Sequence, residues 1–393
     1  MQKKYLVILG DGMADEPLEE LGGRTPLEYA QTPNMDRVSR EGSMGMLRTI
    51  PRGFEAGSDI ANLSILGYDP RSFYTGRGPL EAASREIPLA TDDIAYRCNL
   101  VTVTNGVMAD FSAGHISSDE GRALFHSLAK HLPSVSVYPG VSYRNLLVVH
   151  GGRGALTVPP HDIVGEEIAP HLPSGDDAPE LLACMATSRE VFSSHPVNQA
   201  RVLRGQAPAT QIWPWSGGKT PALPPFSERF GLKGGVISAV DLLQGIARCA
   251  RMEVIRVPGA TGYLDTDYQA KARYALDALE HLDFVYVHVE APDEAGHLGS
   301  ASEKVLAIER LDGLVGTILD AFSGVLAILP DHPTPIRIKT HTGDPVPFAI
   351  LGKGRDTSRS YSEREGARGM YGTIDATDFL PLLFAEPGRS RVS

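Results

Sequence analysis

Apolar residues gather in short, uninterrupted runs near both ends of the chain. Each run is bounded by Gly, Pro or Asp, and it lacks the alternation of polar and apolar positions that marks a strand with one wet face. Continuous runs of this length are typical of strands buried on both faces of a parallel sheet. The expected strands are residues 6–10, 235–239, 252–257, 284–289, 325–329 and 348–351.

Helical patterns separate these runs. They cover residues 239–250, 268–281 and 302–322. Strands that alternate with helices are typical of an open α/β fold, in which helices cover both faces of the sheet. The pattern therefore predicts a doubly wound α/β domain with a mostly parallel sheet.

The middle of the chain has a different pattern. Its runs are short, often alternate, and are separated by Asn-Gly, Pro-Gly and Gly-Gly pairs, which favour hairpins between antiparallel strands. A helix is expected at residues 119–131. The pattern predicts a smaller α+β domain at 82–185, inserted into the α/β domain formed by 1–81 and 186–393. Its expected strands are residues 96–103, 106–111, 135–138, 143–149 and 155–158.

Composition and charge narrow the functional classes. A length of 393 residues favours two domains. The net charge of −11 argues against a nucleic acid or an acidic membrane as partner, because phosphate groups attract basic surfaces. A small anionic substrate is compatible with this charge, since a local group of Arg and Lys can hold it. The sequence is also compatible with a homo-oligomer.

The N-terminal and cysteine patterns point to the cytoplasm. The first apolar run, residues 5–9, is much shorter than the apolar region of a signal peptide, and no run approaches about 18 apolar residues. The three cysteines, Cys98, Cys184 and Cys249, have no metal-type spacing and are odd in number. Ordinary buried thiols in a reducing compartment are the simplest interpretation.

Residues that commonly bind metals follow three of the expected strands. Asp11 follows the first strand, and ligands of open α/β sheets bind beyond the carboxyl ends of strands. Asp293 and His297 follow the strand at 284–289, and their spacing of four places them on one face of a helix. Taken alone, that pair also fits an ordinary helix start with a surface histidine.

The strand at 325–329 is followed by more residues of the types that bind metals. Asp331 and His332 follow the strand at 325–329, and His341 precedes the strand at 348–351. Six ligand-type residues at one sheet edge exceed what one catalytic ion needs, so the pattern predicts two divalent ions. The six are Asp11, Asp293, His297, Asp331, His332 and His341.

Ser58 is the expected nucleophile. It follows Gly57 and precedes a helical pattern, so we expect it to cap that helix, which is an ordinary structural role for serine. In a catalytic role, the helix N-terminus and a neighbouring cation would lower the pKa of its hydroxyl group, which could then attack phosphorus.

Several motifs resemble the archaeal-type, 2,3-bisphosphoglycerate-independent phosphoglycerate mutases of the alkaline phosphatase superfamily. Together they cover nearly the whole chain. The motifs are Gly10-Asp11-Gly12-Met13, Thr32-Pro33-Asn34-Met35-Asp36, Gly57-Ser58-Asp59-Ile60-Ala61-Asn62, Tyr74-Thr75-Gly76-Arg77-Gly78-Pro79-Leu80-Glu81, Asp110-Phe111-Ser112-Ala113-Gly114-His115 and Ala291-Pro292-Asp293.

The resemblance implies a reaction and a ligand arrangement. The reaction is the interconversion of 3-phosphoglycerate and 2-phosphoglycerate through a phosphoserine at Ser58, without bisphosphoglycerate. The ions are typically Mn²⁺ in this family, with Mg²⁺, Co²⁺ or Zn²⁺ as alternatives. One ion would be held by Asp11, Ser58, Asp331 and His332, and the other by Asp293, His297 and His341.

The inserted domain is expected to act as a lid that binds the substrate's anionic groups. His115 and Arg144 are its expected anion ligands, since the fork of an arginine matches two carboxylate oxygens. The resemblance adds Lys219 and Arg77, for which a solvated surface charge is an equally good interpretation.

The sequence is also compatible with other functions. The chain resembles proposed bacterial homoserine kinases about as closely, so a phosphotransferase acting on another small hydroxylated acceptor is one alternative. A metal-dependent phosphatase is another. The phosphate-loop pattern Gly-x-x-x-x-Gly-Lys-Ser/Thr is absent, which excludes a P-loop kinase. A binding protein with an inactive site is disfavoured, because the nucleophile and ligand positions are intact.

Overall fold

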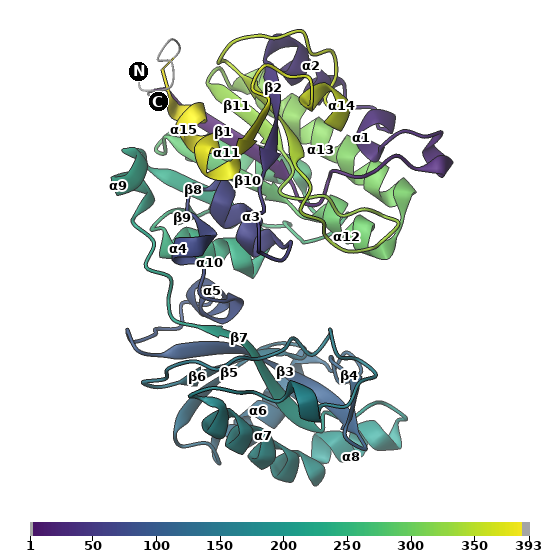
Figure 1. Cartoon of the computed structure of the whole chain (residues 1–393), viewed down its shortest axis with the longest axis vertical. Helices are drawn as coiled ribbons and strands as arrows, with labels where there is room; N and C mark the ends of the chain where they lie inside the picture. Colours follow the sequence, from purple (N-terminus) through teal and green to yellow (C-terminus); the bar gives the residue numbers. More distant parts are fainter. Residues whose placement is uncertain (1–2, 387–393) are drawn as a thin grey trace. The chain divides into compact units, whose positions relative to one another are not determined.

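The computed structural model describes residues 3–386 and divides into two compact units (Figure 1). The α/β unit contains the chain up to Tyr74 and from Leu223 onward. The inserted unit contains Thr75–Ala222. In the described residues, no helix combines the length and the apolar character needed to cross a membrane.

The α/β unit is built on an eight-stranded sheet within the described residues, in the order β13-β2-β12-β11-β1-β10-β8-β9. Strand β12 is antiparallel to both of its neighbours, and the other pairs are parallel. This confirms the predicted α/β class with a mostly parallel sheet. The strands are β1 (Tyr5–Gly10), β2 (Ser43–Arg48), β8 (Gly234–Ile237), β9 (Glu253–Val254), β10 (Phe284–Val289), β11 (Val325–Leu329), β12 (Val346–Leu351) and β13 (Thr373–Asp375).

The three central strands end at the same edge of the sheet. All residues of β1, β10 and β11 are buried, as their continuous apolar sequences require. Leu9 of β1 lies opposite His288 of β10 and Leu329 of β11. The residues that follow each strand therefore emerge side by side.

Helices cover the sheet of the α/β unit. Apolar residues of α2, α11 and α13 share one core with β1, β10 and β11. The longer helices are α2 (Pro33–Glu41), α3 (Ser58–Ile65), α10 (Asp241–Cys249), α11 (Tyr268–Ala278), α12 (Ala291–Leu298) and α13 (Ala301–Ala321). The short ones are η1 (Glu19–Leu21), α1 (Pro26–Tyr29), α4 (Pro70–Phe73), α9 (Phe226–Phe230), α14 (Glu363–Gly366), η3 (Ala376–Asp378) and α15 (Phe379–Phe384).

The inserted unit is a five-stranded antiparallel sheet with helices. The order is β4-β3-β6-β5, and β7 also pairs with the long strand β3. The strands are β3 (Ile94–Thr104), β4 (Val107–Asp110), β5 (Val135–Val141), β6 (Arg144–Val149) and β7 (Gln211–Gly218). The helices are α5 (Arg77–Ser84), α6 (Ser118–Ala129), η2 (Ala169–His171), α7 (Ala178–Ser193) and α8 (Pro196–Leu203).

The structure differs from the sequence pattern at the edges of this unit. The segment 155–158, expected as a strand, makes only a single bridge between Leu156 and Ser174. Strand β7, which the pattern did not indicate, pairs with β3, so the compact unit extends past the expected end at 185. It also begins before 82, because α5 packs on β3.

A buried lysine joins two loops at the carboxyl edge of the α/β sheet. The side chains of Lys304 and Asp15 are fully buried, and Lys304 Nζ lies 2.7 Å from Asp15 Oδ2. Lys304 Nζ also donates to the carbonyl oxygens of Ala14 and Thr334, at 3.1 and 2.8 Å. A buried cation with three oxygen partners holds the loop after β1 against the loop after β11.

Replacing this lysine should strongly destabilise the α/β unit. Lys304→Ala leaves the Asp15 carboxylate buried without its cation, which typically costs about 3–5 kcal/mol. The free energy of unfolding, measured in urea by far-ultraviolet circular dichroism, should fall by that amount. Lys233→Ala, at an exposed lysine, should change it by less than about 0.5 kcal/mol. Equal effects of the two substitutions would contradict this assignment.

Candidate active site

The ligand-type residues predicted from the sequence meet at one edge of the α/β sheet. Asp11, Asp331 and His332 form one group whose ligand atoms lie within 4.8 Å of one another. Asp293, His332 and His341 form a second group by the same measure. His332 belongs to both groups, so the two potential metal sites are adjacent.

Ser58 faces this cluster from the start of α3. We expected its hydroxyl to cap the helix, but the helix cap is Gly57, and no side chain caps this helix. The Oγ atom of Ser58 lies instead 3.1 Å from Nε2 of His332. Asn62 holds the first turn of α3 in place by donating to the Ser58 carbonyl oxygen and to Oδ2 of Asp331, at 2.8 and 2.9 Å.

When their rings are neutral, as metal binding requires, two histidines present an unprotonated nitrogen to the cluster. Nδ1 of His297 donates to the Lys339 carbonyl oxygen at 3.0 Å, and Nδ1 of His341 donates to that of Ala56 at 3.3 Å. Because a carbonyl can only accept, these bonds place the proton on Nδ1 and leave Nε2 as the acceptor in the neutral ring. The two Nε2 atoms are 3.0 Å apart, so their lone pairs repel unless a proton or a metal ion lies between them.

Asp293 lies beside both of these nitrogens. Its Oδ2 is 3.2 Å from Nε2 of His297, and its Oδ1 is 3.5 Å from Nε2 of His341. Burial alone would raise the pKa of Asp293, but the hydrogen bonds from the two histidines hold it well below the usual range. An ionised carboxylate and two imidazole nitrogens form a donor set suited to a divalent ion.

Asp11 has one paired and one unpaired oxygen. Its Oδ2 accepts from Nε2 of His288 at 3.0 Å. Its Oδ1 is buried and accepts no hydrogen bond, and the nearest ion-pair partner is Nε2 of His332 at 3.4 Å. Burial, with the negative charges of Asp331 and Asp293, raises the pKa of Asp11 well above its usual value. A cation next to Oδ1 would satisfy the unpaired oxygen and offset this repulsion.

Several supporting residues were missed by the sequence reasoning. His288 holds Asp11, the hydroxyl of Thr334 donates to Asp293, and the hydroxyl of Tyr286 donates to Asn62 at 2.6 Å. Glu290 has a buried oxygen without a hydrogen bond, 3.6 Å from Nδ1 of His288. The sequence does contain a sign of these residues. Tyr286 and His288 are polar side chains inside the otherwise apolar run at 284–289, and a buried polar side chain needs a hydrogen-bond partner.

The predicted substrate ligands lie in the inserted unit. The guanidinium of Arg144 lies near the ring of Tyr143, which also contacts the ring of Phe111 and the imidazole of His115. The positive charges of Arg77 and Arg144 act on the nearby Arg97, whose pKa is lowered chiefly by burial. The ammonium of Lys219 lies 3.4 Å from Asp92 on the surface of this unit.

A family model and two solved structures are similar to this chain. A family model described as 2,3-bisphosphoglycerate-independent phosphoglycerate mutase matches residues 39–198. A solved structure from Pyrococcus horikoshii shares 33% identity over 99% of this chain and all of that one, with a TM-score of 0.85. The cofactor-independent phosphoglycerate mutase of Thermoplasma acidophilum superposes with a TM-score of 0.67 at 28% identity, over 97% of this chain and 98% of that one. The fold is that of the cofactor-independent mutases.

Curated relatives identify the family. The 2,3-bisphosphoglycerate-independent phosphoglycerate mutase of Methanothrix thermoacetophila is 53% identical over 97% of this chain and the whole of that protein. A probable enzyme of the same description from Geobacter sulfurreducens is 51% identical over 93% of each chain. The chain belongs to the family of 2,3-bisphosphoglycerate-independent phosphoglycerate mutases and is an enzyme of that type.

The metal-free protein should contain an unusually basic histidine. Its hydrogen bond to Asp293, opposed by partial burial, raises the pKa of His297 from 6.5 to about 9. Because the folded-state pKa is raised, the stabilisation is complete below about pH 6.5 and is lost as the pH rises through about 9. Titration of ¹³C-labelled histidines by NMR, with His297→Gln for assignment, should show one ring that titrates near pH 9. Titration of that ring at or below pH 6.5 would contradict the geometry.

Proposed function

We propose that this enzyme interconverts 3-phosphoglycerate and 2-phosphoglycerate through a phosphoserine at Ser58, beside two divalent metal ions. The observation that carries the proposal is the 3.1 Å approach of Ser58 Oγ to His332 Nε2, because His332 belongs to both donor groups. A serine hydroxyl at the start of a helix, beside two metal-type groups, is the arrangement expected of a phosphoryl-accepting nucleophile.

The resemblance to the family implies the ligands of each ion. Asp11, Ser58, Asp331 and His332 would hold one ion. Asp293, His297 and His341 would hold the other. Oxygen and nitrogen donors without a thiolate suit Mn²⁺, and also Mg²⁺, Co²⁺ and Zn²⁺. Bound there, the ions would neutralise negative charge on the phosphoryl group during its transfer.

The residues of the chain then perform two transfers. In the first, Ser58 Oγ forms a bond to phosphorus as the bond from phosphorus to the 3-oxygen of glycerate breaks. In the second, the 2-hydroxyl of glycerate forms a bond to the same phosphorus, and the bond to Ser58 breaks. The peptide dipoles at the start of α3 favour the deprotonated serine oxygen in both transfers.

The inserted unit would hold the carboxylate of the substrate. Arg144 carries an exposed guanidinium beside Tyr143, and Arg77 adds positive charge nearby, whereas the buried Arg97 is ion-paired with Glu81. An arginine fork binds the two oxygens of a carboxylate with defined geometry. His115 would add a further donor to the carboxylate. Lys219 would add a further positive charge to the unit.

Metal analysis should find about two ions per chain, roughly 3.5–4 Å apart. Asp331→Ala should lose mainly the ion beside Ser58, and His297→Ala mainly the other, because each variant removes one proposed ligand of that ion. Mass-spectrometric metal counting and Mn²⁺ titration calorimetry measure both losses. His281→Ala, at an exposed histidine paired with Glu253, should keep both ions. A single ion in the unmodified enzyme would overturn the two-metal assignment.

Arg144→Ala should separate mutase activity from simple hydrolysis. Loss of a charge that holds the carboxylate costs about 2–5 kcal/mol, so the acceptor would escape and water would resolve the phosphoserine. Mutase activity, measured with 3-phosphoglycerate and an enolase-coupled assay, should fall far more than hydrolysis of a generic phosphate monoester. Arg122→Ala, at an exposed arginine of the same unit, should leave both activities unchanged. Equal losses of both activities in Arg144→Ala would contradict a carboxylate-binding role.

A further inference from the structure

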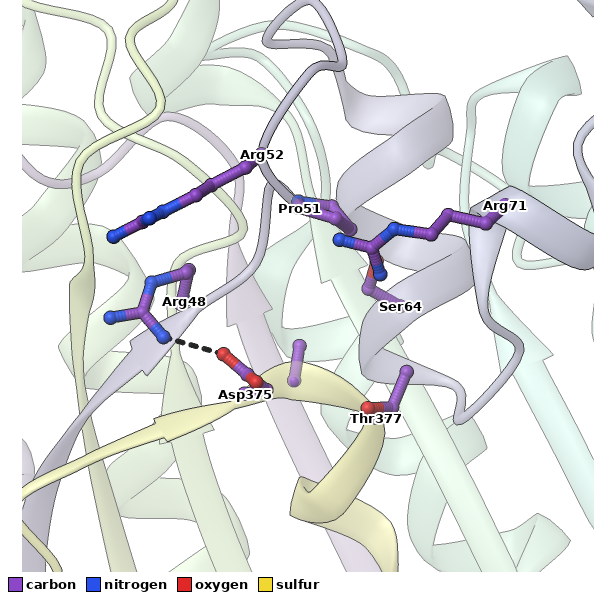
Figure 2. A pocket seen from close by; sticks show the side chains of 8 residues that line it. Arg48, Pro51, Arg52, Ser64, Arg71, Asp375 and Thr377 are labelled. Atoms are coloured by element: carbon purple, nitrogen blue, oxygen red, sulfur yellow. Dashed lines mark hydrogen bonds and ion pairs between the residues drawn. The ribbon is translucent and has the colours of Figure 1, made fainter.

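A cationic cavity lies in the α/β unit. Its volume is about 220 Å³. Arg48 at the end of β2, Arg52 in the following loop and Arg71 on α4 contribute to its wall. Figure 2 shows Arg48 and Arg52 on one side of this three-arginine pocket and Arg71 on the other. The remaining lining residues are Pro51, Ser64, Asp375, Ala376 and Thr377.

Positive charge exceeds negative charge at this pocket. Arg48 forms an ion pair with Asp375, which is the one acidic residue among those lining the cavity. Arg71 lies 3.5 Å from Asp69, whose carboxylate also caps α4. Arg52 forms no ion pair with any described residue. Three guanidinium groups around one small space repel one another, and this occurs in a protein whose net charge is −11.

The chemistry of the wall defines the class of ligand. Arginine forks match the oxygens of phosphate and carboxylate groups, and the hydroxyl of Thr377 offers a further polar contact. No aromatic side chain lines the cavity, so it lacks a stacking surface for a nucleotide base. The volume is also below the roughly 300–1,000 Å³ of sites for drug-sized ligands. We propose that the three-arginine pocket binds a compact phosphorylated anion.

The pocket shares its walls with the segments that carry the nucleophile. Arg52 belongs to the loop between β2 and α3, and the same loop supplies the Ala56 carbonyl oxygen that accepts from His341. Ser64 lies on α3, the helix that begins at Ser58. An anion that bridges Arg52 and Arg71 would therefore restrain the loop ahead of Ser58. This regulatory consequence, unlike the binding itself, rests on the proposed role of Ser58.

Phosphate titration tests the binding. Inorganic phosphate is titrated calorimetrically into the full-length enzyme at constant ionic strength, once with Mn²⁺ and once after chelation of metals. Arg52→Gln and Arg71→Gln should each weaken one binding event about tenfold or more, because each removes a charge-assisted hydrogen bond. Arg37→Gln, at an exposed arginine paired with Glu41, should leave that event unchanged. Circular dichroism confirms that each variant is folded.

The metal-free titration separates this pocket from the proposed active site. The event that depends on Arg52 should persist without metals, whereas phosphate bound between metal ions would be lost. Hydrogen exchange of the peptide covering residues 49–57 should slow with phosphate in the unmodified enzyme and remain unchanged in Arg52→Gln. No phosphate binding, or binding unaffected by both pocket variants, would overturn the proposal. Phosphate binding without slower exchange would overturn the link to the nucleophile loop.

Discussion

The burial of three carboxylates at one edge of a parallel sheet is the main physical constraint on the α/β unit. Asp11, Asp293 and Asp331 are each 5% exposed or less. Buried negative charges at close range are stable only when hydrogen bonds, cations or protons compensate them. Backbone N–H groups and Asn62 compensate Asp331, and histidines compensate Asp293. The remaining unpaired oxygen, Oδ1 of Asp11, is where the need for a cation is clearest.

Other contacts in the α/β unit fix the positions of these carboxylates relative to one another. The central strands end together, so their following residues emerge at one edge. Lys304 then fixes the loops after β1 and β11 against each other, and Asn62 ties α3, the helix that begins at Ser58, to Asp331. The candidate site is therefore built by long-range contacts between segments that are far apart in the sequence. Loss of any one contact would move one of these carboxylates relative to Ser58.

Much of this arrangement could be predicted from the sequence. Continuous apolar runs identified β1, β10 and β11, and the carboxyl-edge rule for α/β sheets then placed Asp11, Asp293 and Asp331 together. The strands β2 and β13 at the edge of the sheet were missed, because their sequences have no long apolar run. Strand β7 was missed because its Pro and Gly residues weaken the strand pattern, while its pairing with β3 depends on tertiary contacts.

The supporting residues of the site could not be predicted in the same way. A polar residue inside a buried strand, such as His288 or Tyr286, shows that a partner is needed but does not identify it. The partners, Asp11 and Asn62, come from other segments. The grouping of His332 with both sets of ligands likewise depends on geometry that spacing alone does not contain.

The most direct test of the account is the detection of phosphate on Ser58. The metal-loaded enzyme is mixed with 3-phosphoglycerate, quenched in acid within the first turnovers, digested and mapped by mass spectrometry. The proposed mechanism predicts a covalent phosphate on the peptide that contains Ser58, and its absence, together with loss of mutase activity, in a folded Ser58→Ala variant. Phosphate on another residue, or mutase activity retained by Ser58→Ala, would contradict it.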